Sequence, residues 1–271
     1  MKETFDFKRF GTYFLYDLKQ MGRNHSKAAV LIGCSGLILY IIWVLCSLVF
    51  AQRWVAPPIE ARVTMFILAF CALELYQTRT YGYLTEKRAG SSWLMIPAST
   101  PEKFVSMLVM TLIVIPVIYI GVYFILDGIL ALLDPTFGKS LFTGTGVAYN
   151  GLLGSLTEIN GERVNLLSPG ALITMSVLGL CFNFLYFLLC GICFKKHKII
   201  GAIGISMGVG LVLSLILGAF TPQWVESMSG MDEEASLRLF HSILNASYVW
   251  SALLTVGIGA GIFYRLKTLK H

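Results

Sequence analysis

Six long apolar stretches constrain the fold of this 271-residue chain more than any motif does. They are residues 28–50, 61–78, 104–126, 169–194, 199–221 and 242–264. At roughly 1.5 Å per residue, a helix of about 20 residues crosses a hydrocarbon layer about 30 Å thick, and a helix satisfies its own backbone there. Charged residues make up only 13% of the chain, well below the roughly 25% of a soluble domain. The sequence therefore predicts an all-α integral membrane protein with six transmembrane helices.

Lys and Arg are distributed unevenly between the two sides that these runs define. Residues 1–27, 79–103, 195–198 and 265–271 hold 16 basic residues, and the segments on the other side hold five. Because loops rich in Lys and Arg stay on the cytoplasmic side, both termini are expected in the cytoplasm. The membrane domain is then 28–264, followed by a basic cytoplasmic tail, 265–271. The outer side receives two longer loops, 134–168 and 222–241, and in the second Asp232 precedes a predicted short helix at 233–245.

The N-terminal segment 1–27 has the pattern of an amphipathic helix. Its apolar residues recur at spacings of three and four: Phe7, Phe10, Phe14, Leu18 and Met21. The segment also carries six basic residues, most of them on other faces of such a helix. We expect a helix that lies in the membrane interface, with its aromatic side chains toward the lipid and its cations toward the phosphates. An arm packed on the protein itself is the alternative.

A short polar stretch, Leu84–Ser106, separates the second and third apolar runs. Ser99, Thr100, Pro101 and Glu102 form a helix-start signature, because Ser or Thr can cap a helix whose first turn holds Pro and Glu. A helix is therefore expected to begin near Pro101 and to continue into the third run. The segment before it is interpreted as a cytoplasmic loop with a short helix at the membrane surface, or simply as a positively charged loop.

The segment IPASTPEKFVSM, within this stretch, resembles the LPAS-x-x-EKF segment of ATP-binding-cassette type-2 permease subunits, especially small ones of Bacteroidetes-like bacteria. Met95 and Ile96 stand where that family usually has leucines. The resemblance implies a permease subunit of an exporter in the bacterial inner membrane, paired with itself or a related subunit. It also implies a separate ATP-binding subunit that docks on the 84–103 loop and supplies the ATP. The docking candidates are Lys87, Arg88, Trp93 and Glu102.

Motifs for catalysis, cofactor binding and metal binding are missing from the sequence. There is no Walker phosphate loop and no HExxH, so the chain is not expected to be an enzyme. Cys190 and Cys193 form a CxxC inside an apolar run, and we interpret them as two small apolar residues. No catalytic, cofactor or metal site and no nucleic-acid partner is therefore predicted.

A few polar and small residues inside the predicted spans are further candidates. Glu74 and Asn183 are the intramembrane polar residues, with a structural partner or a water-lined groove as the ordinary explanation for Glu74. Glycines recur at GxxxG spacing in the last two spans, at Gly201, Gly204, Gly208, Gly257 and Gly261. They permit close helix packing, either within one chain or at a dimer seam.

Two other functions fit the same sequence. One is an ion-coupled secondary transporter with Glu74 as its coupling group, although the two halves of the chain share no evident repeat. The other is a non-transporting membrane scaffold or resistance factor. No side chain selects among lipids, peptides, drugs and glycans as the substrate.

Overall fold

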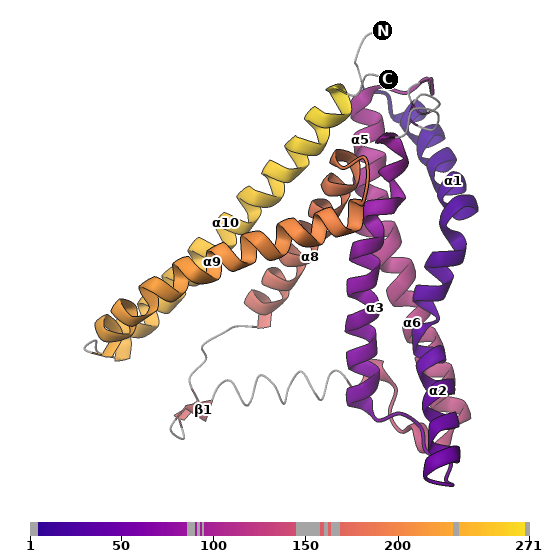
Figure 1. The fold of residues 1–271 in the computed structure, drawn as a ribbon, viewed down its shortest axis with the longest axis vertical. Coiled ribbons are helices and arrows are strands. Elements are labelled where there is room, and N and C mark those ends of the chain that lie inside the picture. The colour runs from indigo at the N-terminus through magenta and orange to yellow at the C-terminus, as the bar shows by residue number, and fades with distance from the viewer. Residues whose placement is uncertain are drawn as a thin grey trace. The chain divides into compact units, whose positions relative to one another are not determined.

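The computed structural model describes residues 5–85, 90, 93, 95–144, 158–159, 162–163, 169–229 and 233–268. The long helices are α1 (Phe7–Gly33), α2 (Ser35–Phe50), α3 (Ile59–Thr80), α5 (Thr100–Val109), α6 (Ile115–Leu133), α8 (Pro169–Cys193), α9 (Lys198–Ser229) and α10 (Glu233–Thr268) (Figure 1). Shorter elements are the 3₁₀ helices η1 (Gly82–Thr85) and η3 (Pro135–Phe137), the π-helical segment η2 (Met110–Val114), and the antiparallel strands β1 (Glu158–Ile159) and β2 (Glu162–Arg163). The predicted all-α class is confirmed, because the two strands add only one short ladder.

The chain divides into two compact units. Unit 1 comprises Met1–Tyr76 and Pro101–Asn165, and unit 2 comprises Gln77–Thr100 and Leu166–His271. Unit 1 thus holds α1, α2, most of α3, and the α5–η2–α6 rod. Unit 2 holds the end of α3 with α8, α9 and α10.

Four helices of the described residues are long and apolar enough to cross a membrane. They are Thr100–Leu133, Ile173–Cys193, Lys198–Ile216 and His241–Thr268. These correspond to the predicted spans 104–126, 169–194, 199–221 and 242–264. The chain therefore has the helices of a membrane protein.

The remaining two predicted spans, 28–50 and 61–78, form helices of a different character. The first part of the run 28–50 belongs to α1, so that only the 16 residues of α2 remain as a separate apolar helix. α3 contains Glu60, Arg62, Glu74 and Arg79, and these charges lower its mean hydropathy. Neither helix is among the four that meet the length and composition needed for a span.

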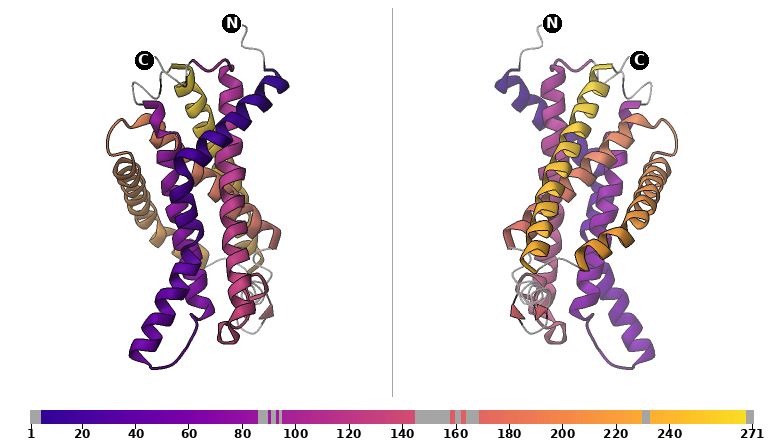
Figure 2. Two further views of the ribbon diagram at one scale, coloured as in Figure 1. Left: turned by 90° about the vertical axis from the view of Figure 1, so that its right-hand side faces the viewer. Right: turned by 90° about the vertical axis from the view of Figure 1, so that its left-hand side faces the viewer.

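The break between α1 and α2 lies at Cys34, six residues into the predicted run 28–50. Two glycines beside the break let α6 approach closely. A Cβ on Gly33 would lie 3.3 Å from Val122 Cγ1, and one on Gly36 would lie 3.0 Å from the Tyr123 ring. α1 and α2 therefore form one bent rod that packs along α6 in unit 1 (Figure 2).

The third predicted span is one continuous helical rod with a local defect. α5 begins at Thr100, which confirms the predicted helix start. The π-helical segment η2 lies directly before Pro116, and the N–H of Ile115 donates to the carbonyl of Met110, five residues earlier. Proline has no N–H and clashes with the preceding turn, so a wider turn at this point accommodates it.

Aromatic side chains join α3 to α6 inside unit 1. The Phe66 ring stacks on Tyr119 with ring centroids 5.5 Å apart and meets Tyr123 edge-on at 5.1 Å. Both tyrosine hydroxyls donate to α3 carbonyls, Tyr119 to Phe66 at 3.0 Å and Tyr123 to Arg62 at 3.0 Å. These bonds satisfy buried hydroxyls while the rings supply the packing.

Unit 2 is built around α8, which packs mainly against α10 and also against α9 and η1. The Tyr186 hydroxyl donates to the Ala202 carbonyl at 2.9 Å, and the Lys198 ammonium donates to the Gly82 carbonyl. α9 extends to Ser229 and α10 begins at Glu233. The helix predicted at 233–245 is therefore the first part of α10, and much of the predicted outer loop 222–241 belongs to these two long helices.

Gly191→Ala should destabilise unit 2, because the new Cβ would lie 2.4 Å from the Thr78 carbonyl oxygen and 2.8 Å from its Cα. Backbone atoms cannot move aside cheaply, so a cost of about 1–3 kcal/mol is expected. Gly179→Ala is the matched control on the same helix, since its Cβ would meet no described atom within 4 Å. Thermal unfolding in detergent should show a lower midpoint for Gly191→Ala and no loss for Gly179→Ala. Equal midpoints would contradict the close approach.

Candidate functional site

The predicted docking residues are not all at the surface. Trp93 is 4% exposed and Glu102 is 0% exposed, so neither side chain offers a contact to a partner. Lys87 and Arg88 lie outside the described residues. In the same segment Met95 is 82% exposed. Two of the four docking candidates taken from the sequence, Trp93 and Glu102, are therefore side chains that the fold buries.

Glu102 instead joins the first turns of α5 and α1. Its carboxylate accepts hydrogen bonds from Arg9 Nε at 2.8 and 2.9 Å and from Arg9 Nη2 at 2.6 Å. It also accepts one from the backbone N–H of Asp6 at 2.9 Å. The hydrogen bond to Glu102 raises the pKa of Arg9 above its ordinary value. A two-pronged guanidinium contact of this kind fixes orientation as well as distance.

A second polar contact lies further along the same two helices. The Ser106 hydroxyl donates to Asp17 Oδ2 at 2.8 Å, and both side chains are buried. Ser106 is one turn beyond Glu102 on α5, and Asp17 is about two turns beyond Arg9 on α1. We call these five residues, Asp6, Arg9, Asp17, Glu102 and Ser106, the α1–α5 clamp.

A buried ion pair lies at the other end of unit 1. Arg62 Nη1 is 3.0 Å from Asp127 Oδ1, and the two residues are 4% and 5% exposed. Arg62 also donates to the carbonyls of Phe137 at 3.2 Å and Lys139 at 2.8 Å, and its guanidinium carbon lies 4.0 Å from the centre of the Phe137 ring. The N–H of Leu141 donates to the second Asp127 oxygen. We call this group the Arg62–Asp127 lock.

Asp134 lies just after α6 and gathers four hydrogen bonds. Its carboxylate accepts from the Tyr40 hydroxyl at 2.8 Å, Trp54 Nε1 at 2.9 Å, and the N–H and hydroxyl of Thr136 at 2.9 and 2.7 Å. Burial by itself would raise the pKa of Asp134, but these hydrogen bonds outweigh it and lower the pKa to about 2. Asp134 therefore ties α2, the α2–α3 connection and η3 together as an anion.

The other predicted residues are spread over both units. Glu74 is 8% exposed on α3, and Asn183 is half-buried on α8. Of the five glycines, Gly201 is close to the Phe194 ring and Gly261 is in contact with Leu189. A Cβ on Gly204, Gly208 or Gly257 would meet no described atom within 4 Å, so these three do not pack within the described part of the chain.

Sequence reasoning missed three buried carboxylates that hold helices together, Asp17, Asp127 and Asp134. One signal was available. Arg62 and Asp127 stand at the same predicted end of the neighbouring second and third apolar runs, where two opposite charges are expected to pair. The partners of Asp17 and Asp134 depend on tertiary packing, and no local pattern points to them.

The contacts described above are hydrogen bonds and ion pairs that position helices. No group of three or more His, Cys, Asp or Glu that could hold a metal ion occurs within the described ranges. The cysteines are free thiols, including Cys190 and Cys193 on α8. What the arrangement does chemically is to fix helix ends by paired charges.

Comparisons of the chain with protein-family models, with curated proteins and with solved structures found no match.

Arg9→Ala should destabilise unit 1 more than Glu102→Gln does. The first change leaves a fully buried carboxylate without its cation, whereas the second leaves a guanidinium that is 40% exposed and can be hydrated. The double variant should therefore resemble Glu102→Gln alone. Thermal midpoints of the three proteins test this, with Lys8→Ala, an exposed change in the same turn of α1, as the control. Additive losses would show that the pair is not coupled.

Asp134→Asn should lower the thermal midpoint at neutral pH and have little effect near pH 2. Because the folded-state pKa of about 2 lies below the ordinary value of 3.8, the stabilisation is fully present above about pH 4 and is lost as pH falls through about 2. The measurement is the difference in midpoint between wild type and variant along a pH series. A difference that stays constant down to pH 2 would contradict the charge-dependent role.

Proposed function

We propose that this chain is the membrane permease subunit of an ATP-driven exporter and that a separate ATP-binding subunit docks on its 84–103 loop. The observation that carries the proposal is the α1–α5 clamp. It joins the helix that follows the loop directly, through Glu102, to an amphipathic N-terminal helix, through Arg9. A displacement of the loop would then move both helices together. The resemblance of IPASTPEKFVSM to type-2 permeases agrees with this arrangement.

Such a movement would be transmitted through the continuous chain and the buried contacts of unit 1. The loop leads into α5, and α5 continues through η2 into α6 without a break in helical hydrogen bonding. α6 ends near the Arg62–Asp127 lock, which ties it to α3 and to residues 137–141. Closure of the ATP-binding subunits would thus tilt the rod and alter the packing at its far end.

The proposed docking surface uses the exposed residues of the loop. Met95 and Pro97 are exposed in the described part of the loop, whereas Trp93 and Glu102 are buried. Lys87 and Arg88 remain docking candidates from the sequence. A second permease subunit would pack on the open glycine faces of α9 and α10.

Met95→Asp combined with Lys87→Glu and Arg88→Glu should abolish co-purification of the ATP-binding subunit, because it removes the exposed apolar contact and reverses the basic charges. Lys195→Glu with Lys196→Glu is the control, since it reverses another exposed basic pair in the α8–α9 connection. The readout is mass spectrometry of proteins that co-purify with the tagged chain.

Absence of any ATP-binding subunit from the wild-type preparation, or its full retention by the triple variant, would sink the proposal. An ion-coupled carrier would instead transport without such a subunit and would depend on the buried Glu74. A scaffold would stimulate no ATPase.

A further inference from the structure

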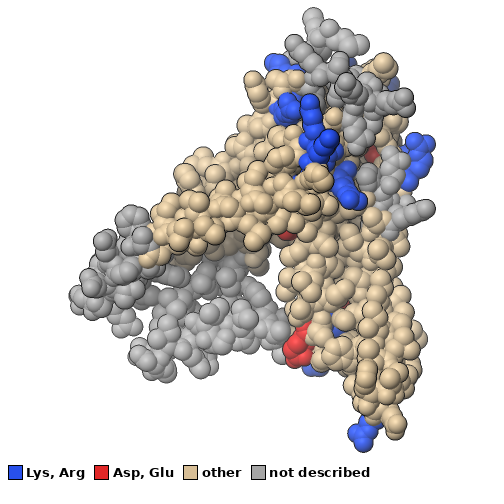
Figure 3. Space-filling view, in the orientation of Figure 1, with Lys and Arg blue, Asp and Glu red and all other residues tan. Residues whose placement is uncertain are grey.

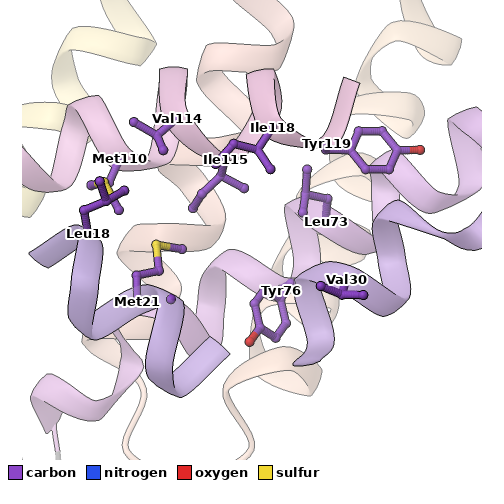
Figure 4. A pocket seen from close by; sticks show the side chains of 11 residues that line it. Leu18, Met21, Val30, Leu73, Tyr76, Met110, Val114, Ile115, Ile118 and Tyr119 are labelled. Atoms are coloured by element: carbon purple, nitrogen blue, oxygen red, sulfur yellow. The ribbon is translucent and has the colours of Figure 1, made fainter. Parts of the chain in front are cut away.

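An apolar cavity lies inside unit 1 where α1, α3 and the α5–η2–α6 rod meet. Its volume is about 250 Å³. The lining side chains are apolar or aromatic, and Figure 4 shows them converging from the three rods: Leu18, Met21, Val30, Leu73, Tyr76, Met110, Val114, Ile115, Ile118 and Tyr119. Gly22 completes the lining, and the lack of a side chain there leaves room. The cavity thus accepts an apolar group and offers almost nothing to a polar one.

The π-helical segment η2 forms part of the cavity wall. Met110 and Val114, the first and last residues of η2, both line it. π-Helical turns inside α-helices often occur at functional sites. The cavity is also open at one side, where Val30 is 60% exposed and Ile118 is 54% exposed. In the membrane protein proposed above, this exposed surface would meet lipid.

Two cations lie on the stripe of α1 that leads to the exposed Val30. Lys19, Arg23 and Val30 have the spacing i, i+4 and i+11, so they share one stripe of α1. Arg23 is about 10 Å from Val30 along the axis. Both cations are exposed, and neither has a carboxylate partner among the described residues. Figure 3 shows most of the blue Lys and Arg side chains toward the top of the view and a few near its bottom, with a largely uncharged tan surface between them.

We infer that this cavity binds one acyl chain of an anionic phospholipid whose phosphate lies beside Lys19 and Arg23. The apolar lining recognises the chain, and the two cations on the same stripe recognise the headgroup charge. The amphipathic α1 places cations at headgroup level and apolar residues below them, which is the order that such a lipid requires.

Photolabelling in nanodiscs tests this site. The probes are phosphatidylglycerol and phosphatidylcholine that carry the same diazirine-bearing acyl chain, and labelled residues are mapped by peptide mass spectrometry. With wild type, phosphatidylglycerol should label residues of the cavity wall several-fold more than phosphatidylcholine does. Lys19→Gln with Arg23→Gln should remove that preference, and Lys195→Gln with Lys196→Gln, which also removes two charges, should keep it.

Gly22→Leu should reduce labelling of the cavity wall several-fold, because the leucine side chain fills the space. Its backbone is helical and its Cβ would meet no described atom within 4 Å, so folding should be preserved. Gly11→Leu is the matched control on the same helix and does not line the cavity. Equal labelling by both lipids, labelling confined to other surfaces of wild type, or a non-lipid molecule retained in native mass spectra would each overturn the inference.

Discussion

The ion pair between Arg62 and Asp127 fixes the arrangement of α3, α6 and the segment that follows α6 in unit 1. Two charges that are removed from water must be paired and hydrogen-bonded, because either one left alone costs several kcal/mol. Here the chain that follows α6 supplies further hydrogen bonds, because Arg62 donates to the carbonyls of Phe137 and Lys139 and Asp127 accepts from the N–H of Leu141. The segment after α6 therefore folds back, and its backbone groups hydrogen-bond to the pair. Arg62 Nε is buried and has no hydrogen-bond partner among the described residues. The ion pair also fixes the orientation of α3 against α6, and the tyrosine hydroxyls of α6 add hydrogen bonds to α3 carbonyls.

The α1–α5 clamp plays the same part at the opposite end. Between the two ends, unit 1 is held by aromatic and aliphatic contacts that resist separation but do little to prevent sliding or rotation, since they have no strong directional preference. Polar contacts at the ends supply the missing directionality. The 34-residue rod Thr100–Leu133 therefore has directional polar contacts near each end. Under the proposed function, a partner that moved one end of the rod would change the polar contacts at the other.

The sequence predicted the features that depend on neighbouring residues. The start of α5 at Thr100 follows from the capping and proline signals of 99–102, and α8 agrees with the predicted run 169–194 within one residue. The break at Cys34 lies where Val122 and Tyr123 approach two glycines, a tertiary contact that no local pattern encodes. Glu102 was expected at the surface because its partner, Arg9, is 93 positions away in the chain and no local pattern reveals the pair. Four of the six predicted spans meet the length and composition of a membrane-crossing helix, and the other two contain charges or a break that the folded chain uses.

The π-helical segment η2 has a consequence for the register of everything that follows it. A π turn holds one residue more than an α turn, so the side chains of α6 are rotated by about 100° from where an uninterrupted α-helix would direct them. Loss of a single residue between Met110 and Val114 would remove that offset and swing Asp127 away from Arg62, although Asp127 lies more than three turns beyond Val114. The π turn therefore sets the rotation of α6, and Asp127 faces Arg62 only while that turn is present.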